Sequence, residues 1–444
     1  MVGVARFELT TSSSRTKRAS QAALHPDFHF NSACYNDTSM EKPLPQKTQN
    51  AIETFKRYSA PNYHPLPVVI ERGEGAWVWD VEGKKYLDCL SAYSAVNQGH
   101  RHPKIVQALK SQAEKITLCS RAFHNDQIGP FLETLCKLSE MECALPMNTG
   151  AEGIETAIKA ARKWGYEKKG VAEDQAEILV CDGNFHGRTT TIVSFSTEPL
   201  YRKHFGPFTP GFRAIPYGDL EALKRAITKN TVAFLYEPIQ GEAGIIIPPA
   251  GFLTAAAELC RKQNVLLIDD EIQTGLGRTG KMFCYQLEKN AKPDLMVLGK
   301  ALGGGVLPIS AVVGPHAVLD LLTPGTHGST FGGNSLACAV GRASLEVLID
   351  EKLADKAEQA GSELMRKLGT LKSAAIKEVR GRGLLIGIEI DKAHGSARPY
   401  CERLMDEGVL CKETHDQVIR LAPPLAIAAG EVDFLIAKLK SVLP

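Results

Sequence analysis

The chain has 444 residues, and its 52 Lys and Arg nearly balance its 50 Asp and Glu, for a net charge of +2. That balance argues against nucleic acid as the main partner, and the lack of any apolar run of about 18 residues excludes a membrane-spanning helix. Eleven cysteines, an odd number spread along the chain, argue against a disulfide framework and indicate a reducing compartment. The length leaves room for two to three domains.

The N-terminal residues 1–42 are predicted to form a flexible tail. Up to about residue 26 they carry four basic side chains against the single acid Glu8, together with many Ser and Thr. This bias is typical of a mitochondrial transit peptide, but a disordered extension of low hydrophobicity explains it equally well. We therefore expect a cytoplasmic protein, with the mitochondrial matrix as the alternative.

Residues 43–95 are expected to form an N-terminal segment that joins a small domain to the active site. Within it, residues 76–88 contain two runs rich in Val, Trp, Tyr and Leu around the turn Val81-Glu-Gly-Lys84. Two such runs separated by a turn predict a β-hairpin.

Residues 96–340 are predicted to form a large α/β domain. Helical stretches such as 104–115 and 131–138 separate short runs that are apolar throughout, and these runs lie at 177–181, 232–236, 265–269 and 295–298. Uniformly apolar runs are typical of strands buried on both faces. Their alternation with helices predicts a mostly parallel central sheet.

Residues 341–444 are predicted to form a smaller α+β domain. The expected elements are a helix over 353–371, a strand over 383–390, a helix over 398–407, strands near Val409 and over 418–421, and a terminal helix from Glu431. The strand over 383–390 alternates in polarity, unlike the strands of the large domain.

The turn Asn148-Thr-Gly-Ala151 follows a predicted strand and opens a helix. Backbone amides at a helix N-terminus are free donors and suit a phosphate group, whereas the simpler interpretation is an ordinary N-cap. Taken alone, the turn does not decide between the two.

Acidic and basic side chains follow two other strands. The run ending at Ile268 is followed by Asp269-Asp-Glu271, and the run ending at Leu298 is followed by Gly299-Lys300. If these strands are neighbours, a carboxylate and an amine share one cleft. A neutral buried lysine can condense with a carbonyl, and a carboxylate can keep a heterocyclic nitrogen protonated, although a structural ion pair explains the two residues equally well.

Three further patterns are set aside. The glycine pattern of residues 275–280 resembles a dinucleotide-binding turn, but several polar residues separate it from the strand and no clear helix follows. His100 and His102 lack a second ligand cluster, so no metal site is expected. Nothing in the sequence marks Cys136 and Cys143 as a reactive redox pair.

Together, the motifs at 148–152, 184–188, 237–242, 270–275, 299–300 and 327–333 resemble those of the class III (ω-amino acid) aminotransferases, in the same order. The resemblance extends from about Pro43 to the C-terminus. It implies the fold-type I scaffold of pyridoxal-phosphate-dependent transferases. Within the family the chain is most similar to the branch that acts on ornithine, on the segments 62–67, 94–99, 162–166 and 419–424.

The resemblance also implies a role for each matching residue around pyridoxal 5'-phosphate. Lys300 would link to the cofactor and later move a proton, and Asp270 would pair with the pyridinium nitrogen. Gln273 would bond the ring hydroxyl, and Phe185 would stack on the ring. The rest of the cofactor set comprises Thr149, Gly150 and Ala151 at the phosphate, His186 and Glu237, and Ser329 and Thr330 from the neighbouring subunit of a homodimer.

On the substrate side, the resemblance implies that Tyr63 and Tyr93 hold the α-amino acid end of L-ornithine. Arg188 would grip a carboxylate. Arg420 would bind the distal carboxylate of 2-oxoglutarate, and Glu242 would neutralise it when ornithine is bound. The expected reaction moves the δ-amino group of ornithine to 2-oxoglutarate and yields glutamate and glutamate 5-semialdehyde, which cyclises to pyrroline-5-carboxylate.

Other functions remain open at this point. His186 stands where the ornithine branch can carry tryptophan, so branches that act on N-acetylornithine or 4-aminobutyrate are alternatives. The glycine pattern of residues 275–280 leaves an NAD-dependent dehydrogenase as a less favoured alternative function. A degenerate binding scaffold would have lost Lys300 or Asp270, and both are present.

Overall fold

The computed structural model describes residues 43–443, and the predicted tail 1–42 lies outside this range. Residues 47–443 form one compact unit. Within residues 43–443, no helix combines the length and the apolar composition needed to cross a membrane.

The predicted hairpin is present as β2 (Trp77–Asp80) and β3 (Lys85–Asp88), which pair antiparallel. Helix α1 (Gln46–Tyr58) and strand β1 (Ile70–Glu74) precede the hairpin, and neither was predicted from the sequence. Strand β1 pairs antiparallel with β2. On its other side β3 pairs in parallel with β13 (Val409–Leu410), so a C-terminal strand completes this N-terminal sheet.

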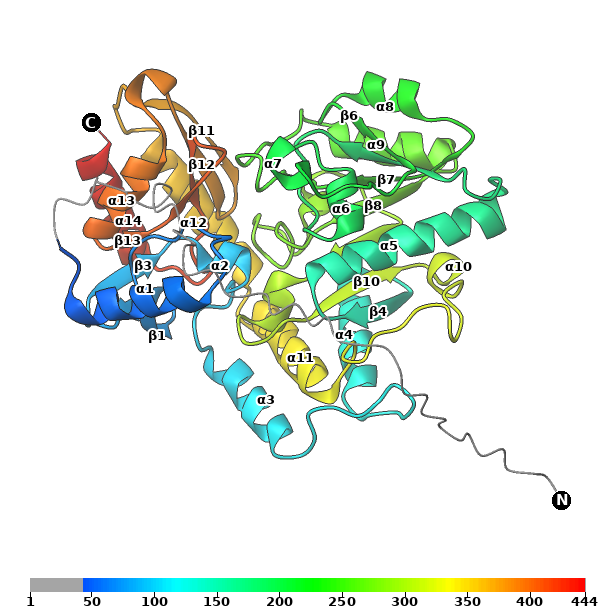
Figure 1. Ribbon diagram of the computed structural model, residues 1–444, viewed down its shortest axis with the longest axis horizontal. Coiled ribbons are helices and arrows are strands. Elements are labelled where there is room, and N and C mark those ends of the chain that lie inside the picture. The colour runs from blue at the N-terminus through cyan, green and yellow to red at the C-terminus, as the bar shows by residue number, and fades with distance from the viewer. Residues whose placement is uncertain (1–42, 444) are drawn as a thin grey trace, which may run out of the picture. The chain divides into compact units, whose positions relative to one another are not determined.

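A seven-stranded sheet dominates the middle of the chain (Figure 1). Its order is β4 (Cys143–Met147), β10 (Ser310–Gly314), β9 (Leu295–Leu298), β8 (Leu266–Asp270), β7 (Thr231–Tyr236), β5 (Glu177–Cys181) and β6 (Phe212–Ile215). β10 alone runs opposite to the other six strands, which confirms the mostly parallel sheet.

Apolar clusters cover both faces of this sheet. Successive side chains of a strand alternate between the two faces, so both sets are buried. Ile178 packs with helix α5 (Gly150–Trp164) in one apolar cluster, whereas its neighbour Leu179 packs in another with helix α9 (Phe252–Lys262). The other helices of this part are α3 (Pro103–Ala113), α4 (Ile128–Ser139), α6 (Thr190–Ser194), α7 (Pro199–Arg202), α8 (Leu220–Ala226) and α10 (His316–Leu319).

Helix α11 (Ser335–Asp350) leads into the C-terminal part and contains residue 341, where the sequence analysis begins its small domain. A third sheet follows, with the antiparallel order β11 (Ile376–Arg382), β12 (Leu385–Ile390), β15 (Val418–Leu421) and β14 (Lys412–Thr414). The predicted helices are present as α12 (Leu353–Leu368), α13 (Arg398–Asp406) and α14 (Ala429–Val442).

Candidate active site

The ends of three strands of the central sheet converge. Strand β8 pairs with β9, so the residues after Asp270 and those after Leu298 lie side by side. A Cβ added to Gly299 would lie 3.7 Å from the Cα of Gly150, and one added to Gly150 would lie 2.9 Å from Ile272. These contacts bring the start of α5, the loop after β8 and Lys300 into one place.

The start of α5 is a helix N-terminus with free donors. The Thr149 hydroxyl accepts from the amide of Glu152 at 3.2 Å, and the Glu152 carboxylate accepts in return from the Thr149 amide at 3.3 Å. Because this capping box uses the amide of Glu152, the amides of Gly150 and Ala151 stay available to an anion. The positive end of the helix dipole adds to that preference.

Asp270 is the acid that faces this site. Its Oδ2 lies 2.6 Å from His186 Nδ1, and its Oδ1 accepts from the Ile272 amide at 3.0 Å. Burial lowers the pKa of His186, but the hydrogen bond and charge of Asp270 outweigh it, so the pKa is raised. The imidazole of His186 therefore orients the Asp270 carboxylate.

Asp269 lies on the other side of the strand, opposite Tyr236 in the register between β7 and β8. It is fully buried, and neither carboxylate oxygen has a donor among the described residues. Burial, with the nearby charge of Glu271, raises its pKa well above the usual range. Asp269 therefore lies on the face of the strand away from Lys300 and His186, in surroundings that favour its protonated form.

Lys300 follows the end of β9 after a single residue, Gly299. Its backbone is in the left-handed conformation, with a φ of 40°. Burial lowers the pKa of its amine, while the carboxylates of Asp270, Glu242 and Glu237 oppose that shift. An amine with a lowered pKa carries more of the neutral form, which is the form that attacks a carbonyl.

Glu237 fixes the loop that carries Phe185. Its Oε2 accepts from the Phe185 amide at 2.9 Å, and its Oε1 accepts from the Gly241 amide at 3.3 Å. Burial raises the pKa of Glu237 to about 7. The structure thus gives this residue a positioning role for the loop that sequence spacing alone could not reveal.

Several buried polar atoms near these groups have no partner among the described residues. They include Oε1 of Gln273 and Nε2 of His186. With the amides at the start of α5, the Lys300 amine and the Asp270 carboxylate, they offer donors and acceptors to a phosphorylated, heterocyclic aldehyde. The residues present therefore fit pyridoxal phosphate.

Arg420, on β15, is fully buried and forms an ion pair with the Glu242 carboxylate. Burial raises the pKa of Glu242, but the charge of Arg420 outweighs it and the pKa is lowered. Gln273 Nε2 donates to the same carboxylate at 3.3 Å. The Glu242–Arg420 pair therefore touches the Gln273 side chain beside Lys300.

Tyr93 lies next to this pair, because the guanidinium carbon of Arg420 is 4.8 Å from its ring centroid. The four residues 91–94 have positive φ angles of 48°, 47°, 60° and 69°, although none is glycine. The amides of Leu90 and Ser91 both donate to Asp88 Oδ1 at 2.9 Å and hold this left-handed turn. Such strain clusters at functional sites, and here it orients Tyr93.

Two other predicted substrate residues lie further out. Tyr63 is 64% exposed. Burial is the main cause that raises the pKa of Tyr93, and an interaction with Tyr63 adds to that increase. Arg188 is exposed, with its guanidinium carbon 3.7 Å from the ring centroid of Tyr201 and 5.4 Å from that of Phe185. Tyr201 thus orients Arg188, and the sequence analysis missed it because no motif marks it.

Ser329 and Thr330 lie at the edge of the site. Ser329 Oγ accepts from Asn148 Nδ2 of the same chain at 2.8 Å, just before the start of α5. Both residues line a surface pocket together with Leu118, Ser120, Arg121 and Gly328.

The glycine pattern at 275–280 has a packing role. A Cβ on Gly277 would lie 3.5 Å from the backbone of Ala354, and one on Gly280 would meet Glu358, so the loop lies directly against α12. Between them Arg278, which the sequence analysis missed, is fully buried and donates to the carbonyl oxygens of Leu384 and Pro423. This loop therefore fastens the β8 end to the C-terminal sheet.

Comparison with known proteins gives a consistent result. The family model for class III aminotransferases matches residues 58–443. The ornithine aminotransferase of Bacillus subtilis (strain 168) is 62% identical over 397 residues, which cover 89% of this chain and 98% of the relative. That of Geobacillus sp. (strain WCH70) is 60% identical over 396 residues, with coverages of 89% and 98%.

Solved structures agree. The crystal structure of the ornithine aminotransferase from Toxoplasma gondii ME49 has a TM-score of 0.87 and 45% identity, covering 93% of this chain and 97% of that one. The acetylornithine aminotransferase from Elizabethkingia anophelis has a TM-score of 0.81 and 47% identity, with coverages of 89% and 98%.

Proposed function

The chain belongs to the class III aminotransferase family, and on that premise we propose that it transfers the δ-amino group of L-ornithine to 2-oxoglutarate. The products are L-glutamate and glutamate 5-semialdehyde, which cyclises to pyrroline-5-carboxylate. The observation that carries the choice of substrate is the pairing of the buried Arg420 with the half-buried Glu242 beside Tyr93. Relatives named ornithine aminotransferase that are 58–62% identical support it.

Bound pyridoxal phosphate supplies the electron sink that stabilises negative charge on the substrate carbon. Lys300 would hold the cofactor through Nζ and, once freed by the substrate, would carry the proton removed from the δ-carbon of ornithine. Asp270, held by His186 and the Ile272 amide, would pair with the protonated ring nitrogen. The amides of Gly150 and Ala151 would bind the phosphate.

Around this centre, Gln273 would bind the ring hydroxyl and Phe185 would cover the ring face. Glu237 holds the Phe185 loop in place. Thr149 caps the helix whose N-terminus receives the phosphate.

The Glu242–Arg420 pair sorts the two substrates. In the first half-reaction Glu242 neutralises Arg420, and the α-amino acid end of ornithine is held by Tyr63 and Tyr93, with Arg188 at its carboxylate. In the second half-reaction the distal carboxylate of 2-oxoglutarate replaces that of Glu242 on the guanidinium. A bidentate arginine–carboxylate contact is strong but exchangeable, which suits this role.

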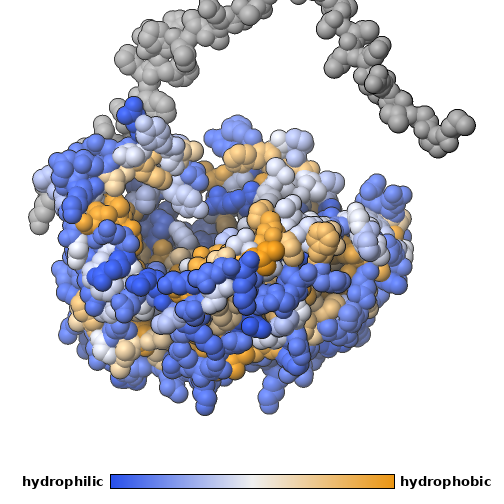
Figure 2. Space-filling model, turned by 90° about the horizontal axis from the view of Figure 1, so that it is seen from below, coloured by the Kyte–Doolittle hydropathy of each residue, from blue (hydrophilic) through white to orange (hydrophobic). Residues whose placement is uncertain are grey.

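We also propose a homodimer with shared active sites, in which Ser329 and Thr330 serve the phosphate site of the neighbouring subunit. Exposed aromatic side chains near this segment support an interface, because Phe331 is 55% and Phe123 is 71% exposed. Figure 2 shows separate apolar patches on an otherwise polar face. Large exposed aromatic groups next to a functional loop are typical of subunit contacts.

The division into a large domain over 96–340 and a small domain built from 43–95 and 341–444 is likewise proposed. The separate C-terminal sheet, which holds Arg420 against Glu242, supports it. All ten cysteines among the described residues are free, which supports a reducing compartment, and we propose the cytoplasm.

The test is product analysis with the purified protein loaded with pyridoxal phosphate. We expect L-ornithine and 2-oxoglutarate to yield equal amounts of glutamate and pyrroline-5-carboxylate by mass spectrometry. N-acetylornithine and 4-aminobutyrate, supplied in parallel at the same concentration, should react more slowly. Faster turnover of N-acetylornithine would contradict the assignment of Tyr63 and Tyr93 to a free α-amino group.

A further inference from the structure

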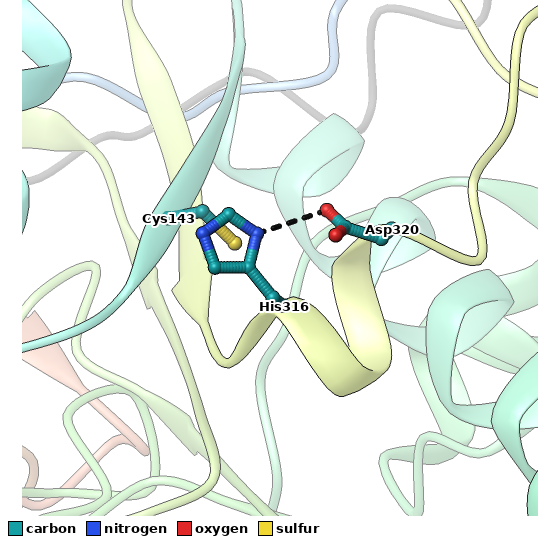
Figure 3. Close-up of side chains that lie close together, drawn as sticks. All are labelled: Cys143, His316 and Asp320. Carbon is teal, nitrogen blue, oxygen red and sulfur yellow. Dashed lines mark hydrogen bonds and ion pairs between the residues drawn. The ribbon is translucent and has the colours of Figure 1, made fainter.

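A cysteine, a histidine and a carboxylate meet at the edge of the central sheet, away from the residues described above. Strand β10 pairs antiparallel with the edge strand β4, and this register sets Gly314 opposite Cys143. The chain leaves β10 at Gly314 and enters α10 at His316, with Asp320 one helical turn later. Figure 3 shows the three side chains together. Cys143 lies far from His316 and Asp320 in the sequence, so ligand spacing could not reveal the three together.

The distances match the needs of a small metal ion. One ligand atom from each side chain lies within 4.8 Å of the other two, and His316 Nδ1 is 3.1 Å from Asp320 Oδ1. In a tetrahedral zinc site with bonds of about 2.0–2.3 Å, ligand atoms are about 3.3–3.7 Å apart. Small side-chain rotations therefore suffice to close the three ligands around one ion.

We propose that Cys143, His316 and Asp320 bind one divalent cation of the zinc type, with water at the fourth position. A thiolate, an imidazole and a carboxylate are the ligands that Zn²⁺ combines, whereas Mg²⁺ and Ca²⁺ prefer oxygen donors alone. On binding, the thiol of Cys143 loses its proton to solvent as the sulfur–metal bond forms.

The charges around the three side chains favour a cation. Among residues 43–443, Asp320 forms an ion pair only with His316, and Glu142 forms none. The Glu142 carboxylate accepts a hydrogen bond from the His316 amide at 2.7 Å. The carboxylates of Asp320 and Glu142 both act on the Cys143 thiol, and their negative charge would attract a cation to it.

Access and position also suit an ion site that lies apart from the reacting groups. Cys143 lines a surface pocket with Cys136 and Glu142, which gives an ion a path to the sulfur. It begins β4, whereas the phosphate-binding turn follows the other end of that strand, roughly 13 Å away at about 3.3 Å per residue. An ion here would fasten the edge strand to β10 and α10 without touching the reacting groups.

The experiment uses the untagged, cofactor-loaded full chain without substrate. Cobalt(II) serves as a spectroscopic probe, because its ligand-field bands in the red lie clear of the cofactor absorbance. Zinc affinity is then measured by competition with a chromophoric chelator. We expect one tight ion per chain, with a sulfur-to-cobalt charge-transfer band.

Three variants test the ligands: Cys143→Ala should lose the charge-transfer band, and His316→Ala and Asp320→Asn should each weaken zinc binding by at least about tenfold. The control Cys136→Ala removes a neighbouring thiol and should bind zinc like the parent chain. All four should keep the parent aminotransferase activity and cofactor absorbance, so the result is independent of the proposed function.

Absence of zinc uptake would overturn the proposal. So would equal affinity in the parent chain and in all three ligand variants, because the trio would then be an exposed His–Asp pair beside an idle thiol. Loss of binding in Cys136→Ala with retention in Cys143→Ala would contradict the assigned sulfur.

Discussion

Replacing Glu242 by Gln separates the role of the Glu242–Arg420 pair from that of the cofactor site. The substitution keeps the shape and the contact with Gln273 but removes the charge that neutralises Arg420. The freed guanidinium should then accept the carboxylate of donors such as glutamate or 4-aminobutyrate. We therefore expect the rate with these donors to rise relative to the rate with ornithine.

The size of this change follows from the geometry of the pair. A hydrogen bond to a charged group contributes about 1.5–3 kcal/mol, and each 1.4 kcal/mol is a factor of ten. The Arg420 side chain is 2% exposed, but that of Glu242 is 24% exposed, so water partly compensates the loss of its charge. The lower half of the range, about 1.5–2.3 kcal/mol, applies, and the preference for ornithine should fall about 10- to 40-fold.

The assay is a single-turnover measurement of the first half-reaction, in which the change in cofactor absorbance is followed with each donor separately. The matched control is Glu413→Gln, which removes another carboxylate near Tyr93 that pairs with Arg398 and leaves Arg420 paired. The control should keep the parent donor ratio. An unchanged ratio in Glu242→Gln would refute the gating role, since the charge would then have no bearing on donor choice.

Three other substitutions test the remaining parts of the account. Lys300→Ala should lower the rate of the first half-reaction by at least about 10²–10⁴-fold, because proton transfer loses its positioned base, and stopped-flow absorbance measures it. Asp269→Asn should raise the melting temperature more at pH 9 than at pH 5. The pKa of Asp269 is higher in the folded than in the unfolded protein. Its contribution to the stability of the fold is therefore complete below the unfolded-state pKa and is lost as the pH rises through the folded-state pKa, whereas Asn stays neutral at every pH. An equal shift at both pH values would contradict a protonated Asp269. Arg278→Met should lower the free energy of unfolding by about 3 kcal/mol in urea titration, because buried carbonyl groups lose their donor, and a loss below about 1 kcal/mol would contradict that role.

Much of the central sheet could be predicted because its strands carry a local signal. Runs such as 177–181 and 295–298 are apolar throughout, since both faces are covered, and all four predicted runs of this kind form strands. Strands β6 and β10 were missed because neither is apolar throughout: β6 contains Arg213, and β10 begins with Ser310. The order of the strands was also hidden, because it depends on packing between segments that are distant in the sequence.

The candidate site divides in a similar way. The convergence of Asp270 and Lys300 followed from a simple rule about strand ends, and the pairing of β8 with β9 confirms that they are neighbours. By contrast, Glu242 and Arg420 were linked only through the family resemblance, since no spacing connects them. The left-handed turn at Tyr93 had no signal, because none of its residues is glycine and tertiary contacts impose its conformation.

The most direct test of the central claim is an absorbance spectrum of the cofactor-loaded protein with L-ornithine in the absence of any keto acid. We expect ornithine to bleach the visible cofactor band faster than N-acetylornithine or 4-aminobutyrate does, and 2-oxoglutarate to restore it. Faster bleaching by another donor would keep the family assignment but contradict the substrate. A protein that shows no cofactor band even after pyridoxal phosphate is added would contradict the whole account.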